Sequence, residues 1–224
     1  MNILYYFRQH VGEVAVSLLV AFLIVGCVPA TKENLSAQTD WRQALSGTEE
    51  SIVTGRIEWM ENGEHKKNEK MLGGFRLLTP SLLRLEDKEK IIVELNENGH
   101  FAWQLSPGTY IFNRINYRDS WSGNYYFVPK TAFKIDQSGL AYYVGTLHAD
   151  FSKERDFIGG VSGVVRFEIR DEYEDAETHQ TTGFKSIEVK KALMVRDENL
   201  PRTLDTTEGF NLTIQILNAI FMGM

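Results

Sequence analysis

Histidine and carboxylate side chains are the groups in this 224-residue sequence that could perform acid–base or metal chemistry. His148 and Asp150 are separated by one residue, and an acidic run follows at 171–177. Imidazole and carboxylate groups that converge within a few ångströms can bind a metal ion or transfer protons. The acidic run lacks the residue order of an EF-hand loop, so we predict a solvated loop there. A metal-dependent hydrolase built on these groups is the less favoured hypothesis.

Three further histidines have no ligand-type spacing to one another: His65, His100 and His179. A solvated position on a strand or at its edge is the simpler explanation for each of them. The sequence also lacks a G-x-S-x-G elbow and a phosphate-binding loop followed by lysine. We therefore predict that the protein is not an enzyme, and that it has no catalytic residue, no metal site and no cofactor.

The single cysteine, Cys27, ends an apolar stretch at 14–25. That stretch is too short to span a bilayer, which requires roughly 20 apolar residues, but it has the length of a signal-peptide core. A cysteine thiolate is a nucleophile that can accept a lipid group. The alternative is a buried cysteine at the end of an uncleaved membrane helix.

The four residues Ile24-Val25-Gly26-Cys27 resemble the lipobox of bacterial lipoprotein precursors. The resemblance implies a signal peptide at 1–26, cleavage before Cys27 and acylation of Cys27 by palmitate-type chains that anchor it in membrane lipid. Two or more acyl chains give stable anchoring. The residue after Cys27 is Val28 and not aspartate. In this respect the chain is similar to lipoproteins that are sorted to the outer membrane. The expected location is therefore the cell envelope, at the periplasmic face of the outer membrane.

Composition narrows the possible partners. The chain has 24 basic and 30 acidic residues, and the loss of residues 1–26 would remove one of each, so the net charge stays at −6. Nucleic acid is excluded as a partner because binding it requires a dense basic surface. With Cys27 acylated, no thiol would remain for a disulfide or a thiolate metal site.

Four aromatic residues in a stretch expected to be a loop, 116–126, form the candidate ligand-binding site: Tyr117, Trp121, Tyr125 and Tyr126. Exposed aromatic rings beside polar groups such as Arg118 and Asp119 stack on sugars or anchor protein partners. The alternative is that these rings cap the open end of a hydrophobic core.

Period-two hydrophobicity interrupted by turn residues predicts an antiparallel β-sandwich. Its expected strands include the segments 91–95, 101–105, 110–115, 125–128, 131–135, 140–147 and 164–169. Tyr110 and Phe112, with Arg114, are expected on one face of their strand, and Ile115 on the other.

The remaining segments frame the expected domain at 51–200. Residues 27–50 are predicted to form the lipidated N-terminus and a tether. A short helix is expected at 184–194, and the C-terminal segment, 201–224, is expected to pack on the domain as a strand or a helix.

The stretch from Asn98 to Ile111 resembles the "G-x-F-x-x-x-L-x-P-G-x-Y" hairpin of prealbumin-like sandwiches, which include carboxypeptidase regulatory-like domains. Gly99 and Gly108 suit the φ > 0 positions of its turns, and Pro107 fixes φ. The resemblance implies a mainly β, prealbumin-like or Ig-like sandwich with a short helical element near the C-terminus. It also implies a binding, spacing or assembly role, and it transfers no catalytic residue.

Together these observations predict a membrane-anchored envelope lipoprotein that acts as a non-enzymatic binding or assembly module. Its expected partners are membrane lipid, through acylated Cys27, and an envelope protein or cell-wall glycan. A carbohydrate-binding module that uses the Trp121 loop is the alternative.

Overall fold

The computed structural model describes residues 29–70, 76–119, 123–155, 161–202 and 207–223. Contacts divide the chain into two units, Met1–Ala30 and Thr31–Met224, and the second contains nearly all of the described residues. None of the helices within these ranges combines the length and the apolar character needed to cross a bilayer. Cys27, the predicted lipidation site, and Trp121, a predicted ligand-binding residue, lie outside the described residues.

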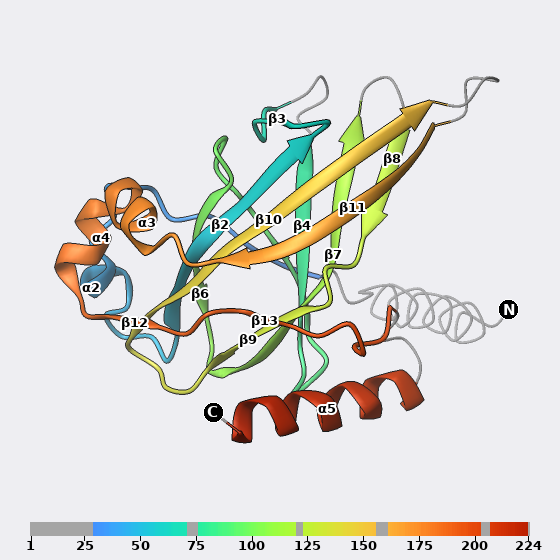
Figure 1. The fold of residues 1–224 in the computed structure, drawn as a ribbon. Coiled ribbons are helices and arrows are strands. Elements are labelled where there is room, and N and C mark those ends of the chain that lie inside the picture. Colours follow the sequence, from blue (N-terminus) through green and yellow to red (C-terminus); the bar gives the residue numbers. More distant parts are fainter. Residues whose placement is uncertain (1–28, 71–75, 120–122, 156–160, 203–206, 224) are drawn as a thin grey trace, which may run out of the picture. The chain divides into compact units, whose positions relative to one another are not determined.

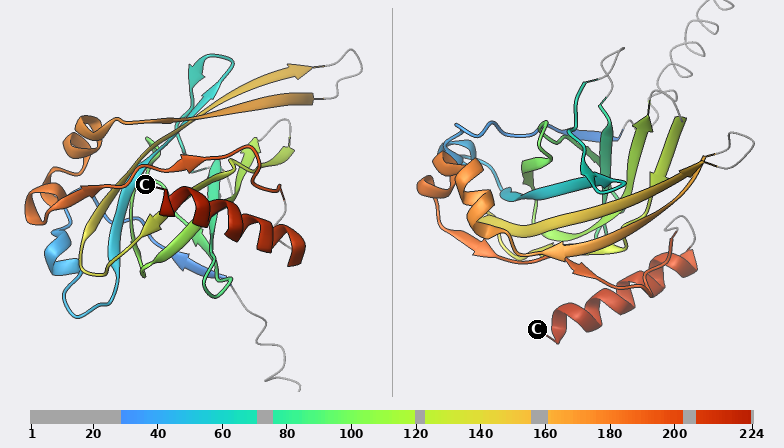
Figure 2. Two further views of the ribbon diagram at one scale, coloured as in Figure 1. Left: turned by 60° about the horizontal axis from the view of Figure 1, so that its bottom comes forward. Right: turned by 45° about the horizontal axis from the view of Figure 1, so that its top comes forward.

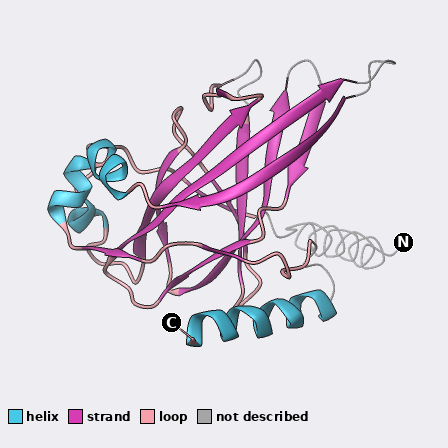
Figure 3. Ribbon diagram, viewed as in Figure 1, coloured by secondary structure: helices cyan, strands magenta, loops and turns pink. Residues whose placement is uncertain are grey.

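Two β-sheets make up most of the second unit (Figure 1 and Figure 3). The first sheet has seven strands: β1 (Ala30–Lys32), β5 (Lys90–Val93), β4 (Leu78–Arg84), β7 (Gly108–Asp119), β9 (Thr131–Ile135) and β13 (Val195–Arg196) in order, with β8 (Gly123–Phe127) also paired with β7. The second sheet has six: β11 (Val161–Arg170), β10 (Ala141–Arg155), β2 (Ser51–Glu61) and β3 (Glu64–His65) in order, with β12 (Val189–Lys191) on β10 and β6 (His100–Leu105) on β2.

The pairing directions refine the predicted sandwich. β2 runs parallel to β10, and β12 also runs parallel to β10. β6 is antiparallel to β2, and β11 is antiparallel to β10. The prediction of a mainly β sandwich is confirmed, and the second sheet is mixed rather than wholly antiparallel.

Alternation along the strands fills the core between the sheets. In β6, Phe101, Trp103 and Leu105 are fully buried in this core, whereas the intervening Ala102 packs in a separate cluster with Trp41. Burial of a leucine or phenylalanine side chain stabilises a fold by about 1.5–3 kcal/mol. The predicted pattern at 101–105 is therefore the inward face of a strand.

A β-bulge corrects the predicted faces of β7. Ser81 and Leu82 are adjacent in β4, but they pair with Arg114 and Phe112, so Asn113 is an extra residue in the register. The bulge shifts the alternation by one position. As a result Ile115 is fully buried in the core and Arg114 is exposed, which is the reverse of the expectation from strict alternation.

The segment expected to be a tether is folded from residue 31 onward. It contributes α2 (Trp41–Ala44), whose N-cap Asp40 accepts a hydrogen bond from the backbone N–H of Gln43. Trp41 is fully buried against Ile52 and Ala141, next to Phe184. Because Trp41 is buried in a cluster with Ile52 and Ala141, the segment that contains it is part of the domain and not a spacer.

The last third of the chain supplies the other helices: α3 (Tyr173–His179), α4 (Thr181–Ser186) and α5 (Thr207–Met222). The acidic segment therefore forms a helix and not the predicted loop. The helix predicted at 184–194 ends at Ser186, since Ile187 adopts an extended conformation and β12 follows along the edge of β10. Figure 2 shows α3 and α4 beside α2, whereas α5 lies apart from them.

The C-terminal segment resolves as a helix. Phe210, Thr213 and Leu217 are buried at helical spacing, whereas Leu212, which strict alternation would bury, is 45% exposed. α5 packs its apolar stripe against residues on the outer side of the first sheet, including Leu83 and Ile111.

Candidate functional site

The outer face of the second sheet carries a row of polar side chains. Arg56 of β2 stands beside His100 of β6 on one side and Thr146 of β10 on the other. Glu58, two residues further along β2, stands beside His148. Because side chains alternate across a strand, these groups share one face of the sheet. α3 packs against β2, the strand at the centre of this row.

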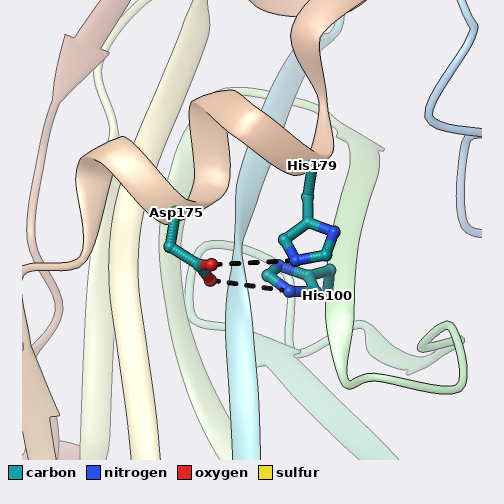
Figure 4. Close-up of side chains that lie close together, drawn as sticks. All are labelled: His100, Asp175 and His179. Carbon is teal, nitrogen blue, oxygen red and sulfur yellow. Dashed lines mark ion pairs between the residues drawn. The ribbon is translucent and has the colours of Figure 1, made fainter.

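His100 of this row and two residues of α3, Asp175 and His179, form a cluster that we call the His–Asp cluster (Figure 4). His100 Nε2 lies 3.6 Å from Asp175 Oδ2, and His179 Nε2 lies 3.7 Å from Asp175 Oδ1. The two imidazole rings are 3.8 Å apart between centroids and tilted by 36°. One ligand atom from each residue falls within 4.8 Å of those of the other two.

His100 is the buried member of the cluster. Its exposed fraction is 1%, and neither of its ring nitrogens has a hydrogen-bond partner among the described residues. Burial lowers the pKa of His100 to about 3, and the positive charges of His179 and Arg56 act in the same direction. The ring is therefore neutral at physiological pH and offers a lone pair on one nitrogen.

A tight turn before β6 fixes the backbone of His100. The Asn96 side chain accepts hydrogen bonds from the backbone N–H groups of Asn98 and His100, and the Asn34 side chain donates to the His100 carbonyl. Gly99 has φ = +82°, and a Cβ there would lie 2.0 Å from the Ile57 carbonyl oxygen. Only glycine fits this turn, so the entry to the strand is set by sequence.

Helix α3 supplies the other two members. Asp175 and His179 are four residues apart, which places them on one face of the helix. The Tyr143 hydroxyl of β10 accepts a hydrogen bond of 2.6 Å from the backbone N–H of Glu172, the residue before α3. Burial raises the pKa of Tyr143 to about 12, so its hydroxyl stays neutral across the physiological range.

Arg56 joins the cluster to the neighbouring charges. Its guanidinium nitrogens lie 3.6 Å from Asp175, 3.9 Å from Glu172 and 3.4 Å from Glu58. Arg56 also donates to His65 Nε2 at 3.3 Å. Every histidine within the described ranges therefore contacts Arg56, Glu58 or Asp175, directly or through the neighbouring ring.

Glu58 and His148 form a separate pair. His148 Nδ1 lies 2.6 Å from Glu58 Oε2 and donates to it. Burial acts to raise the pKa of Glu58, but the hydrogen bond from His148 and the charge of Arg56 outweigh it, so the net shift is downward. No hydrogen bond or ion pair links Asp150 to His148 or to Glu172 in the part of the chain that the structure describes. The hydrolase hypothesis, which requires His148, Asp150 and an acid of 171–177 to converge, therefore gains no support from these contacts.

The aromatic candidates separate into different environments. Tyr117 is buried, stacks on Trp59 at 5.1 Å and donates a 2.6 Å hydrogen bond to Glu61. Tyr125 pairs with it across β7 and β8 and is half-buried, whereas Tyr126 is 70% exposed. The stretch expected to be a loop is thus mainly a hairpin, and its described tyrosines do not form one surface.

A cavity of about 420 Å³ lies beside this hairpin. It is lined by Arg76, Thr79, Asn116, Tyr117, Arg118, Asn124 and Tyr125. Cavities of this size suit small ligands. The guanidinium and amide groups in its lining can form hydrogen bonds with polar ligand atoms.

Sequence reasoning missed the His–Asp cluster for two reasons. The spacing of Asp175 and His179 signals a shared face only if the segment is helical, and a loop was predicted there. His100 reaches the cluster from a strand far away in sequence, for which no local signal exists. In the comparisons with known proteins, no family model and no curated protein sequence matches this chain.

Proposed function

We propose that this chain is a lipid-anchored protein of the bacterial cell envelope that acts as a non-enzymatic binding or assembly module. In this proposal Cys27 is acylated, the body faces the periplasm from the outer membrane, and the partner is an envelope protein or cell-wall glycan. The observation that carries the proposal is the sequence Ile24-Val25-Gly26-Cys27 at the end of an apolar stretch.

Two features of the folded unit support it. Only Val28 and Pro29 separate Cys27 from β1 in sequence, so the anchor would be attached directly before a folded domain. Among the described residues, the side chains with ligand atoms within 4.8 Å of one another are His100, Asp175 and His179, so His148, Asp150 and Glu172 lend no support to the alternative of a hydrolase.

The test is metabolic labelling of cells with an alkyne fatty acid, followed by intact-mass analysis of the protein. We expect the wild-type chain to be labelled and to have lost residues 1–26, whereas Cys27→Ser is unlabelled. Ser36→Ala, an exposed change outside the motif, serves as the control and keeps the label. Recovery of a full-length chain with a free thiol would contradict the proposal.

A second candidate, glycan binding, is favoured by the cavity beside Tyr125 together with the exposed ring of Tyr126. Co-sedimentation with purified cell wall tests it. Trp121→Ala combined with Tyr126→Ala should reduce the bound fraction several-fold, whereas Leu212→Ala, an exposed apolar residue on α5, should not. If the Trp121→Ala, Tyr126→Ala variant and the Leu212→Ala variant both bound cell wall to the same fraction as wild type, glycan binding at this site would be ruled out.

A further inference from the structure

We propose that His100, Asp175 and His179 form a binding site for a divalent transition-metal ion, with Zn²⁺ as the best chemical match. The residues come from β6 and α3, and Figure 4 shows both imidazole rings directed at the same carboxylate. Two imidazole nitrogens and one carboxylate oxygen are among the donors that Zn²⁺ takes in proteins.

The distances suit this donor set. With ligand bonds of about 2.0–2.2 Å, neighbouring ligand atoms in a tetrahedral zinc site are roughly 3.3 Å apart. The two nitrogen–oxygen separations are 3.6 Å and 3.7 Å, and all three ligand atoms fall within 4.8 Å of one another. The two separations run to different oxygens of Asp175, Oδ2 and Oδ1, so binding of one ion requires the side chains to draw together.

The buried, unpartnered imidazole of His100 is the independent evidence. A polar group left buried without a hydrogen-bond partner destabilises the fold. His100 is 1% exposed, and its Nε2, which faces Asp175, has no hydrogen bond within the described residues. A metal ion at this nitrogen would satisfy it.

Local structure holds the ligands in place before an ion arrives. The Asn96 turn and the close approach of Gly99 to Ile57 fix the backbone of His100. The hydrogen bond between Glu172 and Tyr143 fixes the start of α3. Pre-positioned ligands reduce the entropy lost on binding, which favours affinity.

The positive charge of Arg56 opposes a cation at this site, but its neighbours outweigh it. Arg56 and Arg170 are the two guanidinium groups of the network. The carboxylates in contact with them number four: Glu58, Glu168, Glu172 and Asp175. The four carboxylates outnumber the two guanidinium groups by two, and this excess of negative charge attracts a divalent ion.

The site would remain open to solvent. The side chains of Asp175 and His179 are 42% and 41% exposed, so an ion could enter from outside. Three protein ligands leave one tetrahedral position for water or for a donor from another molecule.

The test is calorimetric titration of the full-length chain in detergent, without a polyhistidine tag, using ZnCl₂ after treatment with a chelator. We expect one saturable Zn²⁺ per chain. Asp175→Asn and His179→Ala should each weaken binding by at least about ten-fold, because the first removes the charge of the carboxylate ligand and the second removes an imidazole ligand. His65→Ala is the matched control: it removes a histidine that contacts Arg56 but is not a ligand, and it should bind as wild type does.

A second readout separates loss of the ligand from loss of the fold. Co²⁺ bound to the wild-type chain should give the visible absorption of a low-coordinate site, and this absorption should be absent in His179→Ala. The thermal unfolding of the metal-free variants should match that of metal-free wild type, since both changed residues are partly exposed. No saturable binding by wild type, or equal binding by His179→Ala, would overturn the proposal.

Discussion

His100 is constrained in its backbone, its burial and its charge state. Its backbone is fixed by a turn, its side chain is buried, and its ring stays neutral beside Arg56 and His179. A neutral buried histidine links the free energy of unfolding to pH, because the unfolded chain can bind a proton at this imidazole and the native chain does not.

The sign of this linkage gives a prediction. The native pKa of His100 is about 3, against an ordinary value of 6.5, so its contribution to stability is complete above pH 6.5 and is lost as pH falls toward 3. Urea unfolding of the chelator-treated protein should therefore show a loss of stability between pH 7 and 5.5. In His100→Gln that loss should be smaller by about 1 kcal/mol.

The exposed histidine His65 provides the comparison. His65→Gln leaves the buried ring intact, so its pH dependence should follow that of wild type. If His100→Gln and wild type lost the same stability over this interval, the native ring would have to be protonated, and the burial argument would fail.

At the scale of residues, the sequence indicated candidate side chains but not which of them lie together in the structure. The acidic run and the histidines were visible candidates, and the four-residue spacing of Asp175 and His179 could have been recognised. The position of His100 could not, because it depends on how β6 lies next to β2. Tyr117 was a candidate for binding, but its burial follows from the β7–β8 pairing, which aromatic content alone does not specify.

Helix α5 allows a matched prediction at the scale of elements. Leu217 is 1% exposed and belongs to the cluster beneath the helix, whereas Leu212 is 45% exposed on the same helix. Leu217→Ala should lower the free energy of unfolding by about 2–5 kcal/mol, because it leaves a cavity. Leu212→Ala should change it by about 0.5 kcal/mol or less. Denaturant titration of both variants measures the difference, and equal effects would mean that α5 does not pack as described.

The contact between α2 and α4 gives a second prediction. A Cβ on Gly183 would lie 2.1 Å from Cε2 of the fully buried Trp41. Alanine is favoured over glycine in a helix by up to about 1 kcal/mol, but overpacking costs about 1–3 kcal/mol. We expect the clash to dominate, so that Gly183→Ala destabilises the protein in urea unfolding.

Thr182 is the control for that change. It is the exposed neighbour of Gly183 in α4, and Thr182→Ala should be close to neutral or slightly stabilising. A Gly183→Ala variant at least as stable as Thr182→Ala would show that α4 can move away from Trp41 at no cost.

Strands were more predictable than helices in this chain. The strand at 131–135 was predicted with the bounds of β9, since its alternation is uninterrupted. Alternation does not predict the faces of a strand that contains a bulge. An extra residue such as Asn113 turns each later side chain of the strand to the opposite face of the sheet. α5 was ambiguous because Phe210, Leu212, Ile214 and Ile216 fit a period of two as well as a helix, and the partner surface decided between them.

The two sheets of the second unit share one core. Trp59 and Phe151 belong to the second sheet, and both contact Tyr117 of the first. Neither inner face can stay buried without the other, so we predict that the sheets unfold together. Urea transitions followed by tryptophan fluorescence and by far-UV circular dichroism should have the same midpoint. Two separated midpoints would show that one sheet persists alone.

The class of the fold was predictable from the sequence, and its mixed topology was not. Alternation and turn residues indicate strands and hairpins, which are local features. The partner of a strand across a long separation is a global property. Nothing in the residues 51–61 specifies that their longest neighbour is β10 and that it runs parallel to them.

This parallel pairing has a consequence for how the chain acquires its structure. Ile52 pairs with Ala141 and Glu61 with Phe151, so β2 cannot find its longest neighbour until synthesis has passed residue 151. Pairings between distant segments also close large loops and slow the search for the native state. The chain therefore lacks its central pair of strands until β2 and β10 meet, and we expect the closure of the long loop between them to limit the rate of folding.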